Sequence, residues 1–193
     1  MFTGIIETLA TVTEIKPEGT NVHFTFASPI TPELKIDQSV AHNGVCLTVV
    51  AINENNYTVT AIEETLNRSN LGELSLGSKV NLERCMQANG RFDGHIVQGH
   101  VDSTGICTKI QDHNGSWKYF FEYQAPEHVT VEKGSITING VSLTVVDSIP
   151  QGFSVAIIPY THEHTNFHQL KVGSTVNLEF DIVGKYVARL LKK

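Results

Sequence analysis

The sequence predicts an all-β protein built from two tandem copies of one domain and closed by a C-terminal helix. Three observations lead to this fold class. A long segment is duplicated, each half contains short β-type runs divided by turn residues, and the pattern of apolar residues becomes helical at the end of the chain. In a chain of 193 residues, each half is predicted to form one small antiparallel barrel or sandwich.

The duplication covers most of each half. Ser39–Glu83 aligns with Ser135–Glu179 without a gap, and roughly nineteen of the 45 positions are identical. Upstream, "FTGIIETLATV" parallels "VQGHVDSTGIC" with a slightly different offset, which implies one small insertion. Because the match extends over a half-chain, it indicates two copies of a domain and not a short repeated motif.

Each half contains several short runs that favour strands. The first half has "VHFTFA", "GVCLTVVAI", "NYTVTAI" and "KVNLE", and the second has "WKYFFEY", "GVSLTVVDS", "FSVAIIP" and "TVNLEF". These runs are rich in β-branched or aromatic residues and are separated by Gly, Asn and Pro. Asn89-Gly90 predicts a turn in the join at residues 86–92.

The end of the chain has a helical period. Val183, Tyr186, Val187, Leu190 and Leu191 are spaced as i, i+3, i+4, i+7 and i+8, and Lys192 and Lys193 complement the helix dipole. This amphipathic helix can pack on its own domain or form an oligomer contact. The expected domains are residues 1–88, residues 89–183 and the helix at 184–193.

Composition restricts the function. A net charge of −6 without a basic cluster argues against a nucleic-acid partner. No apolar run approaches the roughly 20 residues of a membrane span, and the N-terminus does not resemble a signal peptide. Three scattered cysteines favour free thiols in a cytoplasmic protein.

The octapeptide "NGVCLTVV" at 43–50 returns as "NGVSLTVV" at 139–146. In an extended strand Val45, Leu47 and Val49 share one face, while Cys46 and Thr48 share the other. The second copy repeats this with Ser142 and Thr144 on the polar face. Two such faces are suited to binding two copies of one small ligand through hydroxyl and backbone groups.

Other chemistry finds weaker support. "THEHTNFH" holds His162, His164 and His168, and "GHIVQGH" holds His95 and His100. Closed zinc sites usually combine such spacing with Cys or acidic ligands, but no Glu follows His164 within the next dozen residues, so no metal is expected. The nucleotide-phosphate loops and the G-x-S-x-G elbow are absent. Cys46 is open to two interpretations: a nucleophile, which requires a cationic neighbour, or a small buried apolar side chain.

Segments along the whole sequence together resemble a known family. "MFTGII", "SVAHNGVCLTV", "ETLNRSNLG", "VNLER", "FDGHIVQGHVDSTG", "INGVSLTV" and "IIPYTHEHTNF" together resemble riboflavin synthase of the alpha-chain type. The resemblance covers essentially the whole chain, with the motifs in the family's order and spacing.

The resemblance implies a fold, a reaction and partners. It implies two six-stranded Greek-key barrels and a C-terminal helix that helps three chains associate. It implies dismutation of two 6,7-dimethyl-8-ribityllumazine molecules, in which a four-carbon unit passes from one to the other without any cofactor. Lumazine synthase is an optional further partner. The duplication then acquires a chemical meaning, because two similar barrels hold two identical substrates.

The resemblance also implies the ligand contacts. In the first half they fall on Gly4, Ile5, Ile6, Cys46, Leu47, Thr48, Thr60, Ala61, Ile62, Glu63, Glu64 and Thr65. In the second barrel they fall on Gly99, His100, Val101, Lys133, Ser142, Leu143, Thr144, Ile158, Pro159, Tyr160, Thr161, His162 and Glu163. Each family site forms where the N-barrel of one chain meets the C-barrel of another. The residues expected to transfer protons or stabilise the adduct are Ser39, Cys46, His100, Thr144 and Asp181.

Two other functions fit the same sequence pattern. A lumazine protein that serves as a light-emitting antenna resembles the family in both halves but keeps a usable site chiefly in one. Here both halves retain polar strand faces, which favours the enzyme. The FMN-binding barrel of flavin reductases is expected to have a following nucleotide-binding domain, for which the sequence offers no room.

Overall fold

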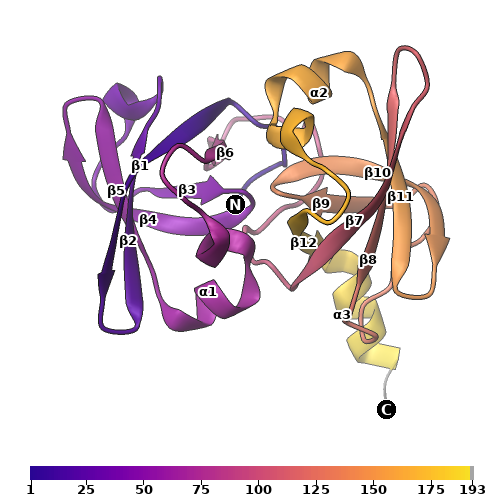
Figure 1. Ribbon diagram of the computed structural model, residues 1–193. Coiled ribbons are helices and arrows are strands. Elements are labelled where there is room, and N and C mark those ends of the chain that lie inside the picture. Colours follow the sequence, from indigo (N-terminus) through magenta and orange to yellow (C-terminus); the bar gives the residue numbers. More distant parts are fainter. Residues whose placement is uncertain (192–193) are drawn as a thin grey trace.

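A computed structural model describes residues 1–191 of the chain and shows two closed antiparallel barrels side by side (Figure 1). The expected all-β fold class is therefore confirmed. Each barrel has six strands, and the strand order is the same in both once the second set is renumbered from its own first strand.

The first barrel has the strand order β1-β2-β5-β4-β3-β6. Its strands are β1 (Thr8–Glu18), β2 (Asn21–Ala27), β3 (Ser39–His42), β4 (Val45–Asn53), β5 (Asn56–Ala61) and β6 (Lys79–Arg84). Strand β6 lies beside β3, after the consecutive strands β3, β4 and β5, which is a Greek-key connection. Pairing of β1 with β6 closes the barrel and removes its free edges.

The second barrel has the strand order β10-β11-β8-β7-β12-β9. Its strands are β7 (Ser103–Asp112), β8 (Trp117–Tyr123), β9 (Ser135–Ile138), β10 (Val141–Ile149), β11 (Gly152–Ile157) and β12 (Thr175–Phe180). All eight runs predicted as strands form strands. The sequence runs did not single out β1, β3, β7 and β9, and two of these are only four residues long.

Helices complete the connections. Helix α1 (Glu63–Arg68) follows β5, and α2 (Pro159–His164) follows β11 at the equivalent position of the second barrel. Three 3-10 turns occupy Thr31–Glu33, Asn70–Glu73 and Asn166–Gln169. Helix α3 (Ile182–Leu191) extends from the second barrel (Figure 1), while Lys192 and Lys193 of the expected helix lie outside the described residues. The predicted turn in the join is present, since Gly90 N–H donates to Gln87 O at 2.8 Å.

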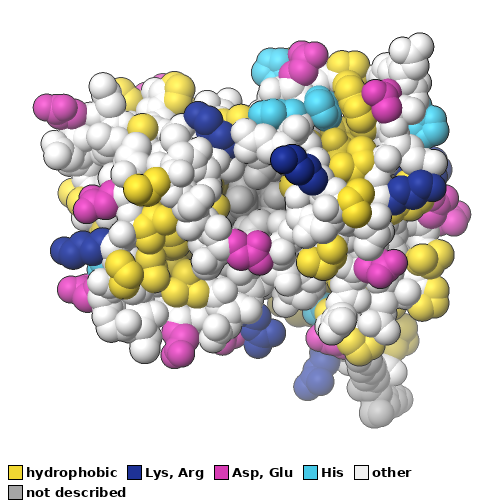
Figure 2. Space-filling view, in the orientation of Figure 1, with side chains coloured by type: hydrophobic (Ala, Val, Ile, Leu, Met, Phe, Trp, Pro, Cys, Tyr) yellow, Lys and Arg dark blue, Asp and Glu magenta, His cyan; other side chains and the backbone are white. Residues whose placement is uncertain are grey.

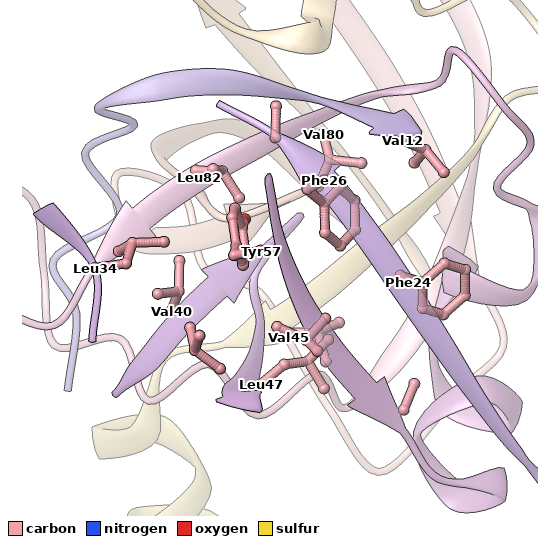
Figure 3. Close-up of a cluster of buried hydrophobic side chains, with 14 of the residues drawn as sticks. Val12, Phe24, Phe26, Leu34, Val40, Val45, Leu47, Tyr57, Val80 and Leu82 are labelled. Carbon is pink, nitrogen blue, oxygen red and sulfur yellow. The ribbon is translucent and has the colours of Figure 1, made fainter. Parts of the chain in front are cut away.

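Each barrel encloses its own apolar core. The first contains Phe24, Phe26 and Tyr57 with the inward side chains of β4 and β6 (Figure 3). The second contains Tyr119, Phe121 and Phe153. As predicted, Val45, Leu47 and Val49 face the first core, whereas Cys46 is half-buried and Thr48 is exposed.

The barrels meet at two identical turns. Asn43-Gly44 and Asn139-Gly140 connect β3 to β4 and β9 to β10, and all four residues have positive φ. An Asn-Gly pair is favoured in such two-residue hairpin turns. A Cβ on Gly44 would lie 2.8 Å from Gly140 N, and a Cβ on Gly140 would lie 2.8 Å from Gly44 N. Glycine is therefore required both by the turn and by the contact between the two barrels.

Candidate functional site

A cavity of about 390 Å³ opens beside the polar face of β4. Its walls come from the first barrel, from the segment before β7 and from a loop of the second barrel. The lining residues are Val45, Cys46, Glu64, Thr65, Arg68, Ser69, Gly99, His100, Val101, Asp102, Glu127 and His128. We refer to this cavity as the first pocket. It brings together Cys46 and His100, which are far apart in the sequence.

Two segments cross between the barrels, and this corrects the expected grouping of contacts. Gly99, His100 and Val101 were expected at the second barrel, but Gly99 O accepts a hydrogen bond from Cys46 N–H at 2.8 Å. Conversely, Gly4 O accepts from Ser142 N–H at 2.8 Å, so Gly4, Ile5 and Ile6 belong with the second barrel. The segments that precede β1 and β7 lie against each other as they cross, with Phe2 bridged to Val97.

The apolar residues of these segments follow the same exchange. Val101 packs against the core of the first barrel, and Ile6 packs against the core of the second. The grouping by sequence was wrong because position along a duplicated chain does not show which copy a connecting segment joins. Each polar strand face is therefore completed by residues from the opposite half of the repeat.

Two buried carboxylates hold the crossing segments in place. Glu83 on β6 accepts from Thr3 N–H at 2.7 Å and Gly4 N–H at 2.9 Å. Glu179 on β12 accepts from the N–H groups of Gln98, Gly99 and His100 at 2.7, 2.9 and 3.0 Å. Burial raises the pKa of Glu83, and it raises the pKa of Glu179 to about 7 against the opposing effect of these hydrogen bonds.

The Cys46 thiol in the first pocket is a weak acid. Burial raises its pKa, while a hydrogen bond with the Ser39 side chain acts in the opposite direction. The thiol is therefore protonated near neutral pH, which favours a hydrogen-bonding or packing role over that of a thiolate nucleophile.

Charged groups line the opposite side of the first pocket. Asp102 accepts from Lys185 Nζ at 2.8 Å and from Phe180 N–H at 2.9 Å, and His128 Nε2 lies 3.9 Å from its carboxylate. On the other wall, Arg68 pairs with Glu64 at 2.8 Å across one turn of α1. The first pocket thus offers both hydrogen-bond donors and acceptors around Cys46 and His100.

The equivalent region of the second barrel surrounds Ser142. The Ser142 hydroxyl lies 2.7 Å from His95 Nδ1, and the Thr137 hydroxyl lies 3.3 Å from His95 Nε2. Burial lowers the pKa of His95, while the charge of Asp181 acts in the opposite direction. Here the His95 imidazole contacts the polar strand face, so the region around Ser142 differs chemically from the region around Cys46.

The remaining expected residues lie at several places around these two regions. Leu47 and Ala61 are buried in the first core, and Leu143 packs against the second. Ser39 pairs with Thr48 across β3 and β4, and Thr144 pairs with Ser135 across β9 and β10. The Thr60 hydroxyl lies 2.9 Å from His23 Nδ1. Residues at the surface are Ile62, Glu63, Lys133, Ile158, Pro159, Tyr160 and Glu163.

The α2 segment is more aromatic than its twin α1. Tyr160 stacks on His164 with ring centroids 4.0 Å apart, and His162 stacks on Trp117 at 3.9 Å. Histidine side chains gather over α2 on the face shown in Figure 2. Thr161 is half-buried beside them. Among residues 1–191 no group of three or more His, Cys, Asp or Glu is arranged to hold a metal ion.

Sequence reasoning missed several residues of the site. Arg68, Asp102, Glu127 and His128 line the first pocket, and Glu83 and Glu179 anchor the two crossing segments. One signal was available for the carboxylates: "VNLE" ends both copies of the repeat with an acidic residue near the end of a buried strand. No comparable pattern marks His128, which reaches the pocket from a loop of the second barrel.

Comparison with known proteins agrees with this architecture. A family model described as the lumazine binding domain matches residues 3–85 and again residues 98–181. Riboflavin synthase of Actinobacillus pleuropneumoniae is 47% identical over 195 residues, which cover 100% of this chain and 91% of that protein. The chain belongs to the riboflavin synthase family.

Other riboflavin synthases match over the same length. The Bacillus subtilis protein is 42% identical, covering 100% of this chain and 91% of its own, and the Saccharomyces cerevisiae protein is 36% identical, covering 98% and 85%. A solved structure, that of LumP complexed with 6,7-dimethyl-8-(1'-D-ribityl)lumazine, superposes with a TM-score of 0.85 at 23% identity. It covers 93% of this chain and 98% of LumP. At this identity the likeness shows the shared fold.

Proposed function

We propose that this protein catalyses the riboflavin synthase reaction. Two molecules of 6,7-dimethyl-8-ribityllumazine react, a four-carbon unit passes from one to the other, and the products are riboflavin and 5-amino-6-ribitylamino-pyrimidinedione. This is the last step of riboflavin biosynthesis. The observation that carries the proposal is full-length identity of 36–47% to riboflavin synthases from several organisms.

The geometry supports a reaction between two identical ligands. Each barrel presents a polar strand position, Cys46 in one and Ser142 in the other, and each position is hydrogen-bonded to a crossing glycine. Exposed backbone beside these positions can match the donors and acceptors of a pyrimidine edge, and hydroxyl or carboxylate side chains can bind a ribityl chain. A dismutation of two identical molecules needs one binding region for each, and the proposed assembly would bring the first barrel of one chain against the second barrel of another so that the two molecules meet.

His100 is the proposed proton-transfer group. The reaction needs removal of a proton from the acidic C7 methyl group of one lumazine, and an imidazole is suited to this near neutral pH. His100 lines the first pocket together with Cys46, and its backbone is held by Glu179. Ser39, Cys46, Thr144 and Asp181 are proposed to assist proton transfer or to stabilise the adduct, and the other expected contacts are proposed to bind substrate.

A homotrimer is the proposed assembly. Helix α3 exposes Val183, Tyr186, Val187, Leu190 and Leu191, each at least half exposed in the single chain. An apolar stripe of this kind favours association with another copy. We further propose a cytoplasmic location and association with lumazine synthase. Within residues 1–191 no helix is both long and apolar enough to cross a membrane.

The test is direct. Purified protein mixed with 6,7-dimethyl-8-ribityllumazine alone, without added cofactor, should generate the absorbance and fluorescence of riboflavin. Tight binding of the lumazine without product would contradict the enzyme and favour the antenna-type protein. That alternative has less support, because identity to LumP is 23–24% whereas identity to riboflavin synthases reaches 47%.

A further inference from the structure

Glu179 is buried on β12 of the second barrel, yet it bonds to a segment that lines the first pocket. Its side chain is 3% exposed, and its carboxylate accepts three backbone N–H groups from Gln98, Gly99 and His100. When Glu179 is ionised, these hydrogen bonds are about twice as strong as bonds to a neutral acceptor. Glu179 therefore fixes the main chain of a segment that leaves the second barrel for the first.

The far side of this segment is the wall of the first pocket. Gly99 O accepts from Cys46 N–H at 2.8 Å, and a Cβ on Gly99 would lie only 2.7 Å from Cys46 Cβ. The segment is therefore clamped between the carboxylate on one side and β4 on the other. His100 follows directly and its own N–H is held by Glu179, so the same clamp sets the position of the His100 backbone at the first pocket.

Glu83 holds the other crossing segment against the second barrel in the same way. It accepts from Thr3 N–H and Gly4 N–H, and Gly4 O in turn accepts from Ser142 N–H of the second barrel at 2.8 Å. Thr3 O also accepts from His95 N–H at 3.1 Å, and the His95 ring contacts the Ser142 hydroxyl. A displacement of residues 3–4 would therefore move His95 and Ser142, and not His100.

The cations that accompany these carboxylates differ. Beside Glu83, Arg84 on the same strand pairs with Glu7 at 2.6 Å. Beside Glu179, the cation is Lys185 of helix α3, which pairs with Asp102 at 2.8 Å. Because Asp102 lines the first pocket, this pocket is fixed by α3 as well as by β12.

We propose that Glu179 is a positioning residue for the first pocket and Glu83 a positioning residue for the region around Ser142 and His95, each acting through the main chain of a crossing segment. This inference rests on the proposed function, because it assigns the two carboxylates to the two substrate sites of one reaction. The alternative is that both carboxylates serve folding alone. In that case their loss would lower stability without a response specific to His100 or to His95.

The test uses the matched variants Glu179→Gln and Glu83→Gln, with Glu54→Gln in an exposed hairpin turn as a surface control. A glutamine turns an N–H donor toward backbone N–H donors, so it releases part of the held segment at nearly the same volume. Circular dichroism and thermal melting establish that each variant is folded. If a Gln variant does not fold, the Asp variant, with the charge kept and the side chain shortened, is measured in its place.

The first readout is structural and needs no enzymatic activity. In long-range ¹H–¹⁵N imidazole spectra, Glu179→Gln should shift the signals of His100 more than those of His95. Glu83→Gln should shift His95 more than His100, and Glu54→Gln should shift neither. Equal responses of both histidines in both variants, or no response in either, would overturn the proposal.

The second readout is catalytic. Glu179→Gln should lower kcat at least tenfold with less than a threefold change in KM, because it displaces His100 and leaves the walls formed by β4 and α1. A parallel change in kcat and KM would overturn the assignment of Glu179 to His100. If the histidine pattern is observed and no riboflavin forms even with the unaltered protein, positioning stands and the proposed function fails.

Discussion

Cys46 and Ser142 occupy the same position of the duplicated octapeptide, but their surroundings differ. The thiol lies in the first pocket, where burial raises its pKa, and the hydroxyl contacts the ring of His95. The proposed reaction is asymmetric as well, because one lumazine gives up four carbons and the other receives them. A polarisable thiol at one site and a hydroxyl at the other would help to distinguish donor from acceptor.

Replacing Cys46 by serine tests this asymmetry. Serine is smaller and a better hydrogen-bond partner, so we expect Cys46→Ser to keep the fold and near-normal lumazine binding while turnover falls clearly. Ser142→Cys should have a milder effect. Ligand titration by fluorescence and steady-state kinetics make the comparison. Full activity of Cys46→Ser would mean that the two residues diverged by drift and that the thiol only packs.

His100→Gln tests the proposed proton transfer. The amide can keep a hydrogen bond in the pocket but cannot accept a proton near neutral pH. General acid–base catalysis typically contributes about 100-fold or more, so kcat should fall by about that factor while lumazine affinity changes little. Stopped-flow turnover and fluorescence titration measure the two effects separately. Equal losses of kcat and affinity would assign His100 to shaping the pocket.

His42 makes the first barrel sensitive to acid. Its Nε2 lies 2.8 Å from Tyr57 Oη inside the core, and burial lowers the pKa of His42 to about 4. Because its pKa in the unfolded chain is near 6.5, the unfolded state binds the proton first as pH falls. Stability from this group is therefore complete above pH 6.5 and is lost progressively down to about pH 4, by about 3 kcal/mol.

The second barrel supplies the matched substitution for this residue pair. Its equivalents of His42 and Tyr57 are Ile138 and Phe153, which are buried and apolar. The double variant His42→Ile, Tyr57→Phe should show a flatter dependence of unfolding free energy on pH between about 4 and 6.5. Tyr57→Phe alone keeps the imidazole and should keep the slope. Urea unfolding at a series of pH values measures both, and an unchanged slope in the double variant would exclude His42 as the cause.

At the scale of elements, helix α3 combines an exposed apolar stripe with one polar anchor. Lys185 on the opposite side pairs with Asp102 at the first pocket. The helix thus has one side bound to its own chain and another available to a second copy. Burial of the apolar stripe would contribute several kcal/mol at about 25 cal/mol per Å².

Deletion of residues 184–193 should therefore weaken association more than it unfolds the barrels. We expect the truncated chain to sediment as a smaller species while its strand signal in circular dichroism remains. Analytical ultracentrifugation across a concentration series makes the measurement. An unchanged sedimentation mass would contradict the role of α3 in assembly.

At the scale of the whole molecule, a buried cluster of six asparagines joins the barrels. They form three pairs of twins in the duplication: Asn43 and Asn139, Asn70 and Asn166, and Asn81 and Asn177. Asn81 Nδ2 donates to Asn139 O at 2.8 Å, and Asn177 Nδ2 donates to Asn43 O at 2.9 Å, so the bonds repeat with the halves exchanged. Apart from Asn70 Oδ1, which is buried without a partner, these side chains are joined by hydrogen bonds, and such a polar network fixes one relative placement of the barrels.

Asn81→Ala should be strongly destabilising because it leaves several buried partners unpaired. It removes an acceptor from Asn166 N–H at 2.8 Å and a donor from Asn139 O. At about 1–3 kcal/mol for each unsatisfied group, the loss should reach about 3 kcal/mol. Asn177→Ala should cost a similar amount, since it makes the equivalent bonds. Urea unfolding compares the two, and a neutral effect of either would show that the network does not hold the barrels together.

The sequence by itself determined the duplication, the eight predicted strands, the helical end of the chain and the two polar strand faces. Each of these depends on side-chain periodicity or on residue identity within a few positions, as in the alternation of Val45, Cys46 and Leu47. The riboflavin synthase family was also evident in the sequence, because its motifs extend over the whole chain in order.

Only the tertiary structure decided which half completes which site. Gly99 and His100 precede the second barrel in the sequence but line the first pocket, and Gly4 precedes the first barrel but pairs with Ser142. Short strands such as β3 and the loop that carries His128 were also beyond prediction from local patterns. The physical reason is that hydrogen bonds between distant segments, above all those accepted by Glu83 and Glu179, fix these positions, and no local spacing records them.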